Sequence, residues 1–165
     1  MTTDTKSLKI RGGLWALGAI LGLLQAWFSR MDIVNDTVSY LDMGNYFFHG
    51  HHESIINGLW APLYAWLLGL MIYVVNPSAY WEYPAVHLLL FFVFLFNMAC
   101  FDYLFRQVAP NWIRYCEDEK GSIPPWVWIT IAYTIFLWAS LSLIGVWETN
   151  PDMLVSAFFL SLIHI

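Results

Sequence analysis

The stretch NDTVSYLDMGNYFFHGHHESIINGLWAPLY, residues 35–64, is a polar, aromatic and acidic segment set between two hydrophobic runs. The chain around it is 59% hydrophobic and only 12% charged, with a mean hydropathy of +0.58. This composition is too apolar for a soluble domain of 165 residues. We therefore predict an all-α integral membrane protein, in which residues 35–64 belong to a long loop at the membrane surface.

Hydrophobic runs predict three membrane spans and an incomplete fourth helix, at about residues 12–28, 85–104, 125–147 and 153–165. The last run has 13 residues, too few to cross a hydrocarbon core of about 30 Å at about 1.5 Å per residue. We therefore expect a chain that is truncated at its C-terminus. The run 59–75 is short, contains Pro62 and Gly69, and is rich in interfacial aromatic residues, which favours a re-entrant or surface helix.

The basic residues predict the orientation of these spans. If residues 59–75 do not cross the membrane, six of the seven lysines and arginines lie on the side of the N-terminus, and only Arg30 lies on the other side. Because cytoplasmic loops are enriched in Lys and Arg, we predict a cytoplasmic N-terminus, an outer loop at 29–84 and a cytoplasmic loop at 105–124. Residues 148–152 then emerge on the same outer side as the loop 29–84.

The opening stretch contains several groups that could perform chemistry. Asn35 or Asp36, both favoured N-caps, is expected to begin a helix that runs to about Phe48. Asp36 and Asp42 are either a cap and a solvated carboxylate, or groups that take a proton from an acceptor hydroxyl or bind a metal. The metal-competent side chains of this stretch are His49, His51 and His52, but their spacing matches no established ligand pattern. A divalent metal is therefore a candidate cofactor, and a hydrated polar loop is the alternative.

Polar and small residues inside the predicted spans have two interpretations each. His87 and Asn97 either form hydrogen bonds between helices or line a polar path. Gly18 and Gly22 form a G-x-x-x-G pair that favours close packing of helices within the chain. No basic stripe is present, which argues against a nucleic-acid partner.

The order of these motifs resembles the N-terminal part of the GT-C glycosyltransferases. The resemblance rests on Asp36 opening DTVSYLDMGNYFFHG, on Trp60 before Pro62-Leu63-Tyr64, and on Pro151-Asp152 before an apolar helix. The branch that it most resembles is glycosyltransferase family 39, which includes bacterial relatives of the protein O-mannosyltransferases and the aminoarabinose transferases of lipid A. Two positions depart from the pattern: Thr37 stands where the family often has a second acid, and the proline motif is Ala-Pro-Leu.

The resemblance implies a membrane enzyme of the cell (inner) membrane. It would transfer a sugar from a polyprenyl-phosphate carrier to a lipid, protein or glycan acceptor on the outer face. Asp36 and Asp152 would be the catalytic acids. Substrate-binding side chains would be Tyr40, Asp42, Trp60, Tyr64 and Glu148. Proteins of this family are much longer, so the chain would be an N-terminal portion. The alternatives are a small non-enzymatic multispanning membrane protein and a transporter subunit in which His87 and Asn97 line a path.

Overall fold

The computed structural model describes residues 5–51, 53, 59–117 and 123–162, and all regular structure in them is helical. The elements are α1 (Thr5–Phe28), α2 (Asn35–Phe48), α3 (Pro62–Val75), α4 (Glu82–Glu117), α5 (Pro125–Trp138), the π-helix η2 (Ala139–Ile144) and α6 (Asp152–Leu162). The predicted all-α class is confirmed. Three helical segments, Thr5–Phe28, Glu82–Ala109 and Pro125–Ile144, are long and apolar enough to cross a membrane, whereas α3 and α6 are shorter.

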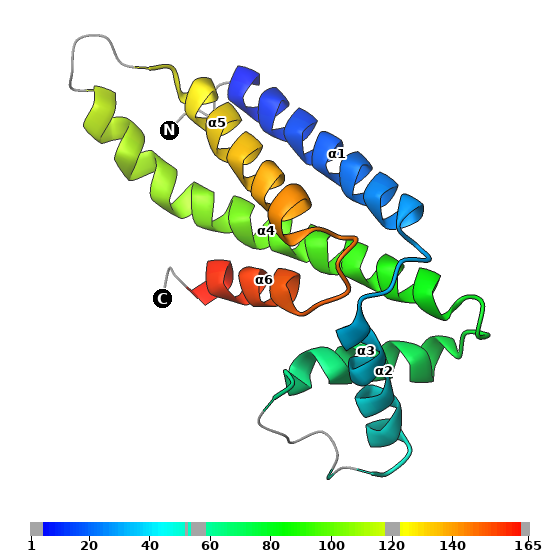
Figure 1. Cartoon of the computed structure of the whole chain (residues 1–165). Coiled ribbons are helices and arrows are strands. Elements are labelled where there is room, and N and C mark those ends of the chain that lie inside the picture. Colours follow the sequence, from blue (N-terminus) through cyan, green and yellow to red (C-terminus); the bar gives the residue numbers. More distant parts are fainter. Residues whose placement is uncertain (1–4, 52, 54–58, 118–122, 163–165) are drawn as a thin grey trace.

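The three long helices form the body of the molecule. Helices α1 and α5 run in the same direction and α4 runs in the opposite one, while α6 lies along α4 (Figure 1). Helices α2 and α3 pack against each other at the end where α1 finishes and α4 begins. The start of α1 and the start of α5 lie at the opposite end. Which end faces the cytoplasm stays a prediction.

Small residues allow α1 to approach its two neighbours closely. A Cβ atom on Gly18 would lie 2.7 Å from Leu137 Cδ2 and 2.8 Å from Met98 Cε, and one on Gly22 would lie 2.6 Å from Phe94 Cε1. Both glycines are buried. The pair therefore serves packing within the chain, as the sequence indicated.

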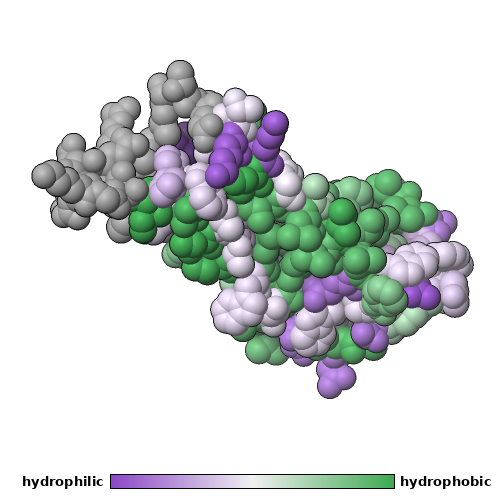
Figure 2. Space-filling model, turned by 90° about the horizontal axis from the view of Figure 1, so that it is seen from above, coloured by the Kyte–Doolittle hydropathy of each residue, from purple (hydrophilic) through white to green (hydrophobic). Residues whose placement is uncertain are grey.

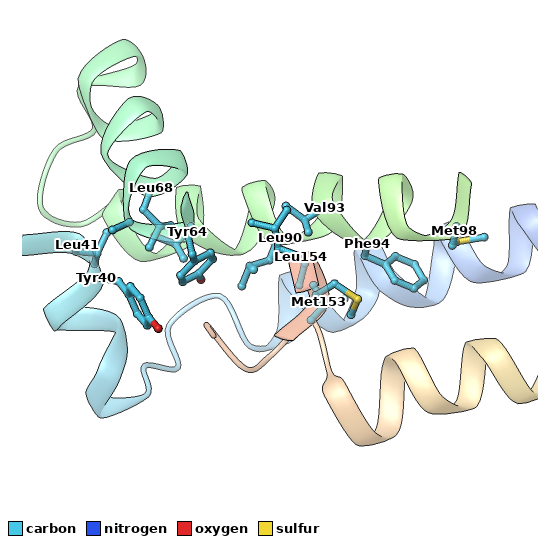
Figure 3. Packing of buried hydrophobic residues seen from close by; sticks show 14 of the residues in the cluster. Tyr40, Leu41, Tyr64, Leu68, Leu90, Val93, Phe94, Met98, Met153 and Leu154 are labelled. Atoms are coloured by element: carbon cyan, nitrogen blue, oxygen red, sulfur yellow. The ribbon is translucent and has the colours of Figure 1, made fainter. Parts of the chain in front are cut away.

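A single hydrophobic core joins the long helices to the short ones. It extends from Tyr40 and Tyr64 in α2 and α3, through Leu90 and Phe94 in α4, to Met153 in α6 (Figure 3). On the outside, hydrophobic residues cover the middle of the molecule and hydrophilic ones gather towards its ends (Figure 2). This distribution is the one expected for helices surrounded by lipid.

One expectation about a helix end needs correction. The N-cap of α2 is Val34, and it makes no side-chain capping bond, so neither Asn35 nor Asp36 is the cap. Both of these residues are already inside the helix. Helices α1 and α4 also extend beyond the predicted spans, to Thr5 and Glu117, because polar residues can continue a helix outside the apolar segment.

Candidate functional site

The first turn of α2 meets the segment that connects η2 to α6. The Thr37 hydroxyl donates a hydrogen bond to the Thr149 carbonyl oxygen at 3.1 Å, and the two hydroxyls also contact each other. The two threonines are almost completely buried, with exposed fractions of 0% and 1%. Asp36 and Glu148 immediately precede these threonines. The structure thus brings together two acidic segments that are far apart in the sequence.

Side-chain hydrogen bonds order the turn before α6. The Asn150 side chain donates through Nδ2 to Glu148 Oε2 at 2.8 Å, and its Oδ1 accepts a hydrogen bond from the Asp152 backbone N–H at 3.1 Å. Asp152 lies in the first turn of α6, just as Asp36 lies in the first turn of α2. The positive end of a helix dipole favours a carboxylate at such a position. Both aspartates are exposed, so a molecule at this surface can reach them.

Three aromatic residues predicted to bind substrate pack together beside this junction. The ring of Tyr40 lies edge-on to Trp60, with centroids 5.1 Å apart, and edge-on to Tyr64, with centroids 4.9 Å apart. Tyr40 and Tyr64 belong to the buried core (Figure 3). Trp60 is half-buried. Tyr40 and Tyr64 therefore support the site from inside the protein, and Trp60 is the aromatic residue that remains accessible.

The hydroxyl of Tyr64 has an unusual environment. Its oxygen is buried and has no hydrogen-bond partner among the described residues. Burial, and to a smaller extent the neighbouring Tyr40, raise the pKa of Tyr64 above its ordinary value. This phenol is therefore neutral at physiological pH.

The remaining predicted site residues lie apart from the junction. Asp42 is exposed, and because it follows Asp36 by six positions it points about 240° further around the α2 axis. His49 Nδ1 lies 2.8 Å from the Asn45 carbonyl oxygen at the end of α2, and the ring of His51 lies edge-on to Tyr46. His52 is outside the described residues. Within the described ranges, no three His, Cys, Asp or Glu side chains are placed to hold a metal ion.

One residue that the sequence analysis missed holds the site in place. Gln25 in α1 donates through Nε2 to the Leu141 carbonyl oxygen and accepts through Oε1 from the Val146 backbone N–H, both at 2.9 Å. The first bond satisfies a backbone carbonyl of the π-helix. The second fixes the start of the segment that leads to Thr149. A single glutamine within the apolar run 12–28 was the available signal, because an intramembrane polar group requires a partner.

The buried polar residues of α4 form contacts between or within helices. Asn97 donates through Nδ2 to Met153 Sδ at 3.1 Å and accepts from the Ser156 hydroxyl at 3.3 Å, which ties α4 to α6. His87 Nδ1 lies 3.0 Å from the carbonyl oxygen of Tyr83 in the same helix. Hydrogen bonding between helices, one of the two interpretations left open, is thus found for Asn97.

A second missed cluster lies at the opposite end of the long helices. The Asp102 carboxylate is buried, lies 3.6 Å from Arg11 Nε and 2.5 Å from Arg106 Nη2, and accepts a hydrogen bond from the Tyr133 hydroxyl. Its partners come from α1, α4 and α5. The cluster therefore holds the three long helices together.

Fold and site together define an all-helical protein with three helices able to cross a membrane and two exposed aspartates at the starts of short helices. Comparisons with protein-family models, curated proteins and solved structures found no match to this chain.

Proposed function

We propose that this chain is a GT-C-type membrane glycosyltransferase, or the N-terminal portion of one, inserted in the cell (inner) membrane. It transfers a sugar from a polyprenyl-phosphate carrier to a lipid, protein or glycan acceptor at the outer face. The observation that carries the proposal is the buried contact between Thr37 and Thr149, because it joins the segments that contain Asp36 and Asp152. The resemblance described above assigns the catalytic acids to these same two positions.

The proposed reaction needs a base and a group that orients the substrates. The acceptor hydroxyl oxygen attacks the anomeric carbon of the sugar, the bond from that carbon to the carrier phosphate oxygen breaks, and polyprenyl phosphate leaves. Asp36 takes the hydroxyl proton, and a positioned base of this kind contributes about 10²–10⁴-fold to the rate. Asp152 orients the acceptor or the donor phosphate, while Glu148 and Trp60 contact the substrates. A divalent metal would neutralise the leaving phosphate.

Two structural facts bear on the competing hypotheses. A transporter subunit would need His87 and Asn97 to face a polar cavity, yet Asn97 is fully buried and both of its amide atoms bond to α6. A small non-enzymatic protein would need no association between the acidic segments, whereas Thr37 joins the two through its hydrogen bond to Thr149.

Replacement of Asp36 tests the assignment directly. Membranes that contain the wild-type chain, Asp36→Ala or Glu53→Ala receive labelled polyprenyl-phosphate sugars, and label in the acceptor fraction is measured. Glu53 is the matched control, because it is another exposed carboxylate of the predicted outer loop, residues 29–84. We expect Asp36→Ala to lower transfer by about 10²-fold or more at an unchanged membrane level, and Glu53→Ala to leave it unchanged. Near wild-type transfer by Asp36→Ala would refute the role of this residue.

A further inference from the structure

An apolar groove of about 450 Å³ lies between the second half of α1 and the start of α4. Its walls include Leu23, Ala26 and Trp27 from α1 and Pro84, Ala85 and Leu88 from α4, and residues of the range 75–81 also line it. The helix ends that line the groove, the end of α1 and the start of α4, lie beside α2 and α3 (Figure 1). Among the described residues, Arg30 is the only charged one in its lining. An apolar groove with a single cation is suited to bind a molecule that has a hydrocarbon chain and a phosphate.

Trp27 holds the Arg30 guanidinium in place without neutralising it. One nitrogen, Nη1, donates to the Trp27 carbonyl oxygen at 2.7 Å, and the guanidinium carbon lies 4.5 Å from the centroid of the Trp27 ring. No carboxylate of the described residues forms an ion pair with Arg30, whereas Arg11 and Arg106 both pair with Asp102. Because a guanidinium has five N–H donors, Arg30 retains donors for a bidentate contact with a phosphate.

The charges that surround the groove distinguish between headgroups. Asp32 follows Arg30 by two positions and is exposed, and Glu82 directly follows the lining residue Trp81. Neither carboxylate lines the groove. Both acids are close in the sequence to residues that line the groove. Arg30 attracts the phosphate of a headgroup, and a headgroup that also has an ammonium group carries a second charge that acids of this kind attract.

We propose that this groove binds a zwitterionic phospholipid of the surrounding bilayer, with its phosphate on the Arg30 guanidinium and one acyl chain between α1 and α4. The proposal goes beyond sugar transfer and rests only on membrane insertion. The bound lipid covers the exposed apolar surface of Trp27 and Trp81, and it fills the space between the two helices next to the α2–α3 pair.

Native mass spectrometry of the whole chain in detergent tests this binding. The protein is incubated with phosphatidylethanolamine, phosphatidylglycerol or polyprenyl phosphate, and the lipid-bound fraction is measured. We expect phosphatidylethanolamine to bind most, Arg30→Gln to lower its bound fraction at least fivefold, and Arg30→Lys to retain part of it. Lys9→Gln is the control, because Lys9 is an exposed cation near the start of α1, and it should leave binding unchanged. Circular dichroism verifies that each variant is helical.

A second variant examines the acyl-chain part of the groove separately. Ala85→Phe narrows the groove with Arg30 intact and should lower binding of phosphatidylethanolamine in the same assay. Equal binding by wild type and Arg30→Gln would overturn the proposal, as would stronger binding of phosphatidylglycerol than of phosphatidylethanolamine. Selective binding of polyprenyl phosphate that Arg30→Gln abolishes, or a dimer that excludes lipid from the groove, would overturn it too. None of these results depends on Asp36, so the glycosyltransferase assignment stands or fails separately.

Discussion

The crossing of α2 and α3 predicts a large effect for one added methyl group. A Cβ atom on Gly44 would lie 2.4 Å from the Ala65 carbonyl oxygen and 2.7 Å from the Gly69 backbone nitrogen. Both neighbours are backbone atoms, so no side-chain rotation can relieve the overlap. Ordinary contacts lie at about 3.5–4.0 Å, and the two helices must therefore separate by about 1 Å. Overpacking of this kind costs about 1–3 kcal/mol.

Alanine also favours a helix by about 1 kcal/mol relative to glycine, and this gain must be removed from the comparison. Gly13→Ala in α1 provides the control, because nothing lies within 4 Å of its added Cβ. We expect Gly44→Ala to be less stable than Gly13→Ala by about 1–3 kcal/mol. Denaturant titration in detergent micelles, followed by circular dichroism, measures the difference, and hydrogen exchange locates it in α2 and α3. Equal stability of the two variants would show that the backbones of α2 and α3 are not in contact at Gly44.

Two further changes test the junction and the buried phenol. Thr37→Val retains the side-chain shape but leaves the buried Thr149 hydroxyl without its partner. The free energy of unfolding should therefore fall by about 1–3 kcal/mol in denaturant titration, whereas Thr37→Ser should retain most of the stability. An unchanged free energy of unfolding for Thr37→Val would contradict the hydrogen bond. Tyr64→Phe removes a buried hydroxyl that has no partner and should preserve or raise stability at pH 8. Because burial raises the pKa of Tyr64, wild type should lose stability as the pH rises above 10.0, the ordinary pKa of the group. Thermal melting at pH 8 and pH 11 should show a smaller loss for phenylalanine, and an equal loss would place the Tyr64 phenol in water.

Helical periodicity predicts only part of how α2 is oriented. Asp36, Tyr40, Met43 and Phe47 share one face at helical spacing; Tyr40 and Met43 are buried and Phe47 is half-buried, but Asp36 is exposed. The burial of Tyr40 and Met43 can be predicted from local sequence, because the most apolar face of a helix packs against the core.

The contacts that build the site depend on distant parts of the chain. Thr37 meets Thr149 because Gln25 fixes the end of η2, and no local pattern encodes the pairing of three such separated positions. Asp102 likewise stands in the sequence without any sign of its partners, and the structure buries it between Arg11 and Arg106. Its role depends on which helices are neighbours, and a single sequence does not reveal that.

The π-helix at the end of α5 changes the direction in which the chain leaves the helix. The Gly145 N–H reaches back five residues to the Ser140 carbonyl oxygen, at 2.9 Å, where an α-helix would reach back four. A π turn contains one residue more than an α turn. The residues that follow are therefore rotated by about 100° around the helix axis, compared with their positions in a continuous α-helix. The direction in which the chain leaves η2 towards Thr149 thus depends on the number of residues in the π-helix.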